Sequence, residues 1–269
     1  MAEEKIRSES EFLWKLILKF ILTPFYFVMF LFGKKSFSEV FSPFIDLLKF
    51  LFEPKFTIGI IILTTITTFY SWIFLTEKTF NLLMNYPLDL FNPSRYFSFI
   101  TTGFIHADLA HLGWNMLTLY IFGRVVERKI GTFKTSVIYF SALIIASIGT
   151  SAANAFIGDN IPGLGASGAI MGLVSAAILL DPFFITYEAI IPLPIMVVGW
   201  FAIYGDLTGV LSRIDDGIGH FAHLFGFLSV SLTLYFFNQG DKNSIKKGFW
   251  INICSIIVII SVYLFLVRN

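Results

Sequence analysis

The chain has 269 residues, of which 56% are hydrophobic and 14% are charged, and its mean hydropathy is +0.79. A soluble domain carries about a quarter charged residues, so this composition excludes a protein whose only solvent is water. A net charge of +1, with basic residues that do not alternate with aromatic ones, argues against nucleic-acid binding. The single Cys254 excludes an intrachain disulfide.

The first apolar stretch, residues 12–33, contains Lys15, Lys19 and Pro24 and is not followed by a small-residue cleavage site. Lys15 and Lys19 lie one helical turn apart, so both ammonium groups can reach the headgroups from a helix in the membrane interface. We therefore expect residues 1–55 to form an N-terminal cytoplasmic or interfacial amphipathic region. An additional membrane span is also compatible with this stretch.

Seven later runs are apolar and, as helices, are candidates to cross about 30 Å of hydrocarbon. They comprise residues 56–74, 111–122, 133–157, 167–180, 190–204, 219–237 and 249–267. Several are shorter than the usual ~20 residues, which indicates helices enclosed by protein or a locally thinned bilayer.

Lysine and arginine concentrate in alternate connections between these runs. Residues 34–55, 124–134 and 242–247 carry most of them, so the positive-inside rule places these segments in the cytoplasm. Residues 75–110 then form a long outer loop, and the second, fourth and sixth spans all begin on the outer side. Their polar residues therefore lie at one depth, which predicts a site that opens to the outer face.

The second span begins with His111 and Asn115, which are four residues apart and so share a helix face. Both side chains can donate to one point, as a pair of oxyanion donors would. A polar pair that joins two membrane helices is the structural alternative, although ionisable residues at this depth favour a function.

The fourth span follows the turn-rich residues 158–166, which places Ser167 at a helix N-terminus. Free N–H groups and the positive end of the helix dipole can hold an oxyanion beside its hydroxyl. Gly165 and Gly168 flank the serine, and small residues here also suit a cap or a close helix contact.

The sixth span carries His223 between the small residues Ala222 and Gly226, which permit an approach to the fourth span and a serine–histidine hydrogen bond. His223 is thus the predicted general base, and His220, nearer the outer end, is the second candidate.

Only a dyad is expected, because none of the acidic residues suits the orienting role. Asp181 follows Ser167 by about 21 Å of helix. Asp206, Asp215 and Asp216 are interpreted as outer-loop residues, less buried than an orienting acid should be.

Between Arg95 and about Gly226, the sequence resembles the rhomboid intramembrane serine proteases. In that family a Trp often precedes the arginine that corresponds to Arg95, whereas this chain has Ser94 there. Met171 occupies a position that is often aromatic in the family. The motifs that carry the resemblance are Arg95, His106-x4-His111-x3-Asn115, Gly123, Glu127, Gly165-x-Ser167-Gly168 and Ala222-His223-x-x-Gly226.

The resemblance implies an all-α membrane protein with a six-helix catalytic core over residues 56–238. Residues 239–269 would add a cytoplasmic loop and a seventh transmembrane helix. Ser167 would be the nucleophile and His223 the base. His111, Asn115 and the Ser167 amide would be the oxyanion donors, with His106, Arg95, Gly165 and Gly168 in supporting roles, and no metal or cofactor is expected.

The function implied is cleavage of transmembrane segments of membrane-protein substrates near the outer face of the bilayer, with the cell membrane as the expected location. The principal alternative is a catalytically inactive rhomboid-like protein that binds membrane clients. A metalloprotease is disfavoured because His-Glu-x-x-His is absent from the sequence, and a transporter because repeated broken spans are not evident. Sequence leaves the substrate and the oligomeric state open.

Overall fold

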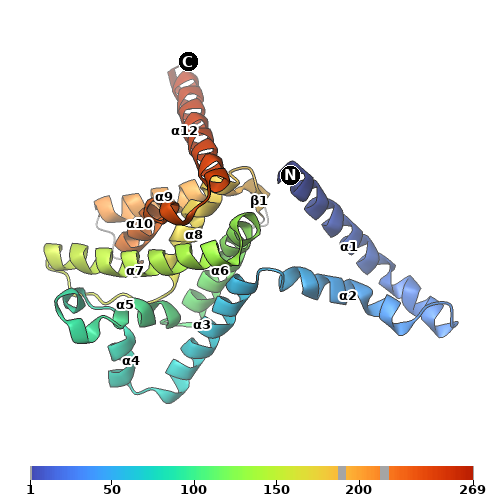
Figure 1. Ribbon diagram of the computed structural model, residues 1–269, viewed down its shortest axis with the longest axis horizontal. Helices are drawn as coiled ribbons and strands as arrows, with labels where there is room; N and C mark the ends of the chain where they lie inside the picture. The colour runs from blue at the N-terminus through green and yellow to red at the C-terminus, as the bar shows by residue number, and fades with distance from the viewer. Residues whose placement is uncertain (1, 187–191, 213–217, 269) are drawn as a thin grey trace. The chain divides into compact units, whose positions relative to one another are not determined.

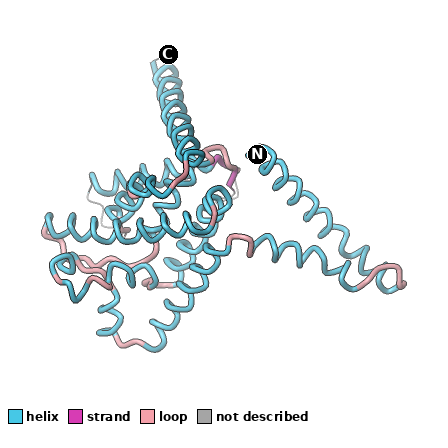
Figure 2. Tube along the Cα trace, in the orientation of Figure 1, coloured by secondary structure: helices cyan, strands magenta, loops and turns pink. Residues whose placement is uncertain are grey.

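The computed structural model describes residues 2–186, 192–212 and 218–268 (Figure 1). The chain divides into two compact units, Met1–Lys55 and Phe56–Asn269. Nearly all regular structure is helical, as Figure 2 shows. The exception within the described residues is a two-residue antiparallel pair, β1 (Ile185–Thr186) with β2 (Leu193–Pro194).

The first unit is a pair of helices, α1 (Ala2–Leu31) and α2 (Phe37–Leu51). A capping box in which Ser36 and Glu39 bond each other's backbone N–H groups starts α2. An ion pair of 2.6 Å between Lys19 and Asp46 joins the two helices. Many large apolar side chains of this unit are exposed, for example Trp14 at 71%, and such a surface suits a lipid environment.

The second unit contains the remaining helices. The long ones are α3 (Lys55–Phe74), α6 (Leu109–Ile130), α7 (Thr132–Ile157), α9 (Ile195–Ser212) and α12 (Gln239–Arg268). The shorter ones are α4 (Glu77–Leu83), η1 (Pro87–Phe91), η2 (Pro93–Arg95), α5 (Ser98–Thr101), η3 (Thr102–Phe104), α8 (Ser167–Leu180), α10 (His220–Leu228), α11 (Val230–Thr233) and η4 (Leu234–Phe236).

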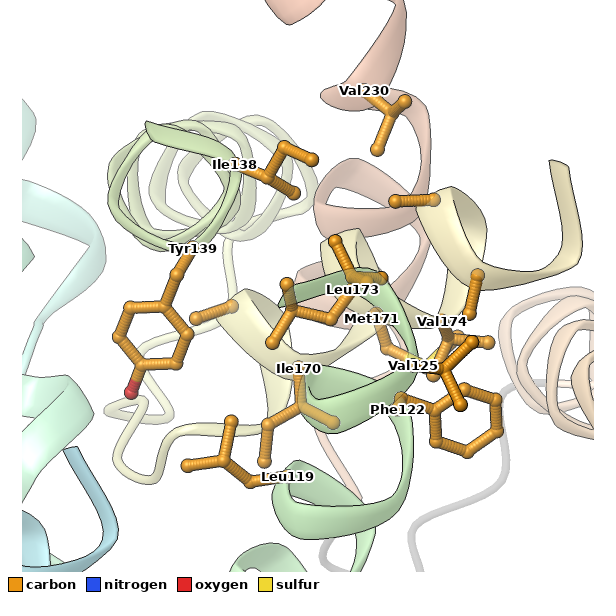
Figure 3. Close-up of a cluster of buried hydrophobic side chains, with 14 of the residues drawn as sticks. Leu119, Phe122, Val125, Ile138, Tyr139, Ile170, Met171, Leu173, Val174 and Val230 are labelled. Atoms are coloured by element: carbon orange, nitrogen blue, oxygen red, sulfur yellow. The ribbon is translucent and has the colours of Figure 1, made fainter. Parts of the chain in front are cut away.

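Helix α8 is the centre of this unit. Every residue from Gly168 to Ile178 is buried, and α8 packs against α6, α7, α10 and α12. Figure 3 shows the apolar cluster that results, in which Leu173 and Ile170 of α8 lie among side chains of α6 and α7. A helix that is apolar on all faces is stable only when enclosed, which explains why 14 residues suffice here.

Among the described residues, five helices are long and apolar enough to cross a membrane: α1, α3, α7, α9 and α12. Helix α8 and the segment His220–Phe236 are shorter apolar helices. The predicted helical membrane fold is confirmed. The N-terminal stretch left open above has the length and hydropathy of a span.

Two predicted runs end several residues before the corresponding helices do, whereas the run 249–267 begins after the start of α12 and the run 219–237 comprises α10, α11 and η4. The run 111–122 belongs to α6, which continues past three cationic residues to Ile130. The run 190–204, whose first two residues lie outside the described part of the chain, corresponds to α9, which begins at Ile195 and continues to Ser212. Both runs ended too early because an apolar window stops at a charged residue, whereas a helix does not.

Glu127 of α6 fixes the start of α3. Its carboxylate accepts hydrogen bonds from the N–H groups of Phe56 and Thr57 at 2.9 and 3.0 Å, and from the hydroxyls of Thr57 and Thr132 at 2.9 and 2.8 Å. The first N–H groups of a helix have no partner within it, so Glu127 caps α3 from a neighbouring helix.

Replacing Glu127 by Ala should lower the free energy of unfolding by about 1–3 kcal/mol, because the buried donors at the start of α3 lose their acceptor. Thermal unfolding in detergent measures the effect. Glu77→Ala, which removes an exposed carboxylate on α4, is the control and should leave the midpoint near that of the wild type. Equal midpoints for the two variants would contradict the capping role.

Candidate active site

Ser167 is the first residue of α8, and its side chain is partly buried. The preceding loop is held in place by Gly165, whose N–H donates to the carbonyl of Thr102 at 2.9 Å. The chain then enters the helix at Ala166, whose carbonyl accepts from Ile170 N–H. The N–H of Ser167 lies in the first turn and has no acceptor within the helix, so it is available to an anion at the positive end of the dipole.

Gly165 brings the loop against His111 and Asn115 of α6. Its φ of +108° is a conformation that favours glycine, and a methyl group there would lie 2.7 Å from His111 Nε2 and 3.8 Å from Asn115 Nδ2. Asn115 is buried, and one of its amide hydrogens is donated to the carbonyl of His111 at 3.0 Å. The two predicted oxyanion donors and the loop before Ser167 are thus in contact.

His106 supports the same loop from the other side. Its Nε2 accepts from Ala166 N–H at 3.4 Å, and its Nδ1 lies 3.2 Å from the Thr68 hydroxyl. That hydroxyl donates to the carbonyl of Phe104, so it accepts the proton on Nδ1, which makes Nδ1–H the tautomer consistent with both contacts. Burial, with a smaller contribution from His111, lowers the pKa of His106 to about 3, so the ring is neutral at pH 7.

His223 reaches the site because α8 and α10 touch at glycines. A methyl group on Gly226 would overlap the carbonyl oxygen of Gly168, and one on Gly168 would lie 3.4 Å from the carbonyl oxygen of Ala222. Ser167 directly precedes Gly168, and His223 directly follows Ala222, so both residues adjoin this contact in sequence. The described contacts include no hydrogen bond between their side chains.

Asp206 is the residue that the sequence interpretation placed wrongly. It lies within α9, not in a loop, and is only 5% exposed. Its Oδ1 is 2.8 Å from His223 Nδ1 and 3.0 Å from His220 Nδ1. The signal that could have found it is a lone Asp that follows an apolar run by two residues, since α9 continues for two further turns. Asp215 and Asp216 lie outside the described residues.

Asp181 is remote from the histidines, as expected. It caps the other end of α8 and forms an ion pair of 2.8 Å with Lys129.

Met171, one turn after Ser167, is buried in the hydrophobic cluster and is labelled in Figure 3. In the described part of the chain, no group of three or more His, Cys, Asp or Glu residues is arranged to hold a metal ion.

Arg95 anchors the segment between α3 and α6. Its guanidinium makes a two-pronged contact with Asp89 at 2.9 and 3.1 Å and also donates to the carbonyls of Leu82 and Met84. Burial opposes ionisation of Asp89, but Arg95, the Tyr86 N–H and the Ser98 hydroxyl outweigh it and hold the pKa of that carboxyl below its usual value. This anchor forms although Ser94 replaces the Trp common at that position.

The Rhomboid domain family matches residues 93–239, more than half of the chain, and the chain therefore belongs to the rhomboid family. RHOMBOID-like protein 12, mitochondrial, of Arabidopsis thaliana is 32% identical over 177 residues, which cover 57% of this chain and 52% of that protein. Rhomboid-type serine protease 2 of Emericella nidulans is 30% identical over 158 residues, covering 58% and 29%.

Rhomboid protease GluP of Bacillus subtilis is 34% identical over 88 residues, which cover 33% of this chain and 16% of that protein. The chain thus matches about half, or less, of the length of these curated relatives. The family includes serine proteases of the membrane as well as proteins named only as rhomboid-like.

Gly165→Ala should disturb the site, because the new methyl group meets the His111 ring and the residue must hold a positive φ. We expect the unfolding midpoint to fall and reaction with a serine-directed fluorophosphonate to slow by more than tenfold at a temperature where the variant is folded.

Gly163→Ala is the matched control in the same loop, since its methyl group would meet only the Asn85 carbonyl oxygen at an ordinary 3.8 Å. It should react at close to the wild-type rate. The contact between Gly165 and His111 would lose its assigned importance if the two variants reacted equally fast.

Proposed function

We propose that this protein is an intramembrane serine endopeptidase that uses Ser167 as nucleophile and His223 as general base. The observation that carries the proposal is a convergence of three elements. The start of α8 presents Ser167, the Gly165 turn contacts His111 and Asn115 of α6, and the Gly168–Gly226 contact brings α10 alongside. Membership of a family that includes serine proteases supports the same chemistry.

In the proposed reaction, His223 takes the proton of the Ser167 hydroxyl as Oγ forms a bond to a peptide carbonyl carbon. The carbonyl oxygen becomes an oxyanion that the Ser167 N–H, the His111 ring and the free amide hydrogen of Asn115 would stabilise. His223 then gives the proton to the departing amine as the C–N bond breaks. Water, with His223 again as base, hydrolyses the acyl-enzyme and restores Ser167.

The proposed substrates are transmembrane segments of other membrane proteins. An α-helix hides its carbonyls in internal hydrogen bonds, so a segment must unwind before Ser167 can attack it, and small or helix-breaking residues near the cut make this easier. The basic connections favour a cytoplasmic N-terminus and a site that opens to the outer side, with the cell membrane as the proposed location. No cofactor is assigned to the reaction.

Ser167→Ala should abolish cleavage of a transmembrane reporter, and His223→Ala should slow it by several orders of magnitude, because each variant removes one reacting group. Ser167→Ala removes a single oxygen and should keep the wild-type unfolding midpoint. The assay uses purified full-length chain in lipid nanodiscs.

Ser175→Ala is the control, since Ser175 is a buried serine of the same helix two turns further on and should retain cleavage. Normal cleavage by Ser167→Ala would refute the assignment. A folded wild type that binds the reporter without cutting it would instead favour the client-binding alternative.

A further inference from the structure

We propose that Asp206 is a positioning residue that sets the tautomer and orientation of His223. Ser167, His223 and Asp206 then act together in the reaction, in place of a Ser167–His223 dyad alone. The inference rests on the proposed function and deepens it. The observation behind it is the 2.8 Å contact between Asp206 Oδ1 and His223 Nδ1.

The direction of this hydrogen bond fixes which ring nitrogen of His223 carries a proton. An ionised carboxylate only accepts, so the hydrogen in the contact belongs to His223 Nδ1. Nε2 is then left with a free lone pair, which is what a base needs to take the proton of a serine hydroxyl. With the opposite tautomer, Nε2 would carry a hydrogen and could not act as that base.

The packing of α9 on α10 places the Asp206 carboxylate beside the histidines of α10. Asp206 and Gly209 lie one turn apart on α9, and His220 and His223 lie one turn apart on α10. The His220 ring occupies the space beside Gly209, where a methyl group would overlap it. Asp206 Oδ1 therefore receives both rings, with His220 Nδ1 at 3.0 Å.

Asp206 is buried, and its carboxylate therefore needs hydrogen-bond donors from the protein. A carboxylate that is 5% exposed in an apolar helix is expensive unless N–H donors compensate it, and the two histidines are such donors. Among the described residues, His220 shares Asp206 Oδ1 with His223, and His111 of α6 lies within electrostatic range of His223.

The proposed role in the reaction is electrostatic as well as geometric. When the proton moves from Ser167 Oγ to His223 Nε2, the ring becomes positively charged in surroundings of low dielectric. The Asp206 carboxylate, 2.8 Å from Nδ1, stabilises that charge and keeps its own charge throughout. No proton passes to Asp206.

The competing explanation is that Asp206 only links α9 to α10. A link would affect stability and substrate affinity, whereas positioning affects the chemical step. Asp206→Asn should therefore lower kcat for a transmembrane reporter by about 10²–10⁴-fold, the upper end being the loss when a triad Asp is replaced. KM should stay within about twofold of the wild-type value.

Two controls separate the explanations. Asp181→Asn removes another buried carboxylate, at the far end of α8, and should leave kcat near the wild-type value even where the unfolding midpoint falls. His220→Gln removes the second donor to Asp206 but keeps the contact between Asp206 and His223. It should therefore slow kcat far less than Asp206→Asn. Equal kcat losses for His220→Gln and Asp206→Asn would mean that Asp206 acts as a link.

A spectroscopic measurement tests the proposal without any cleavage assay, and its wild-type part does not depend on whether a variant of Asp206 folds. The sequence has four histidines, so ¹⁵N-histidine labelling of the full chain in nanodiscs gives few ring resonances, and the spectrum of His223→Ala assigns those of His223. At pH 8 the wild type should show His223 protonated at Nδ1, and Asp206→Asn should show a mixture of tautomers.

The outcomes distinguish this inference from the proposed function. His223 protonated at Nε2 in the wild type, or a wild-type kcat in Asp206→Asn, would overturn the role of Asp206 whether or not Ser167 is the nucleophile. Reporter cleavage that survives Ser167→Ala would refute the proposed function, and the tautomer of His223 would still report on Asp206.

Discussion

The contact between Gly168 of α8 and Gly226 of α10 is the constraint on which the site depends. With no Cβ on either residue, the backbones approach until the Gly168 carbonyl lies where a side chain of residue 226 would be. Ser167 and His223 belong to helices that are distant in sequence, and neither side chain is long enough to compensate for a wider spacing. Apolar packing around α8 then holds the approach in place.

The polar groups at this position must satisfy one another because the surrounding helices offer apolar side chains. His106 bonds to Thr68 and to the loop before Ser167, Asn115 bonds to the backbone of its own helix, and Asp206 bonds to two histidines. Buried polar groups without such partners would be costly, so the site is also a set of interhelical links. Stability and chemistry are therefore coupled here.

Much of this arrangement was predictable from the sequence, because the residues that carry it leave local signals. His111 and Asn115 have helical spacing, Ser167 follows a turn-rich loop, and His223 lies among small residues. Asp206 escaped prediction because hydropathy alone ended its helix at Tyr204, whereas burial by α10 lets α9 carry a charge and continue to Ser212. A contact between residues on different helices has no local signal, and only packing reveals it.

We infer that Ser167, and no other serine, is the covalent nucleophile. The most direct measurement is to label the purified wild type in nanodiscs with a fluorophosphonate and to locate the adduct by mass spectrometry of the proteolysed chain. We expect one modified residue, Ser167, and loss of the adduct when His223 is replaced by Ala. An adduct on a different serine, or a folded wild type that forms none under conditions in which it cleaves a reporter, would contradict it.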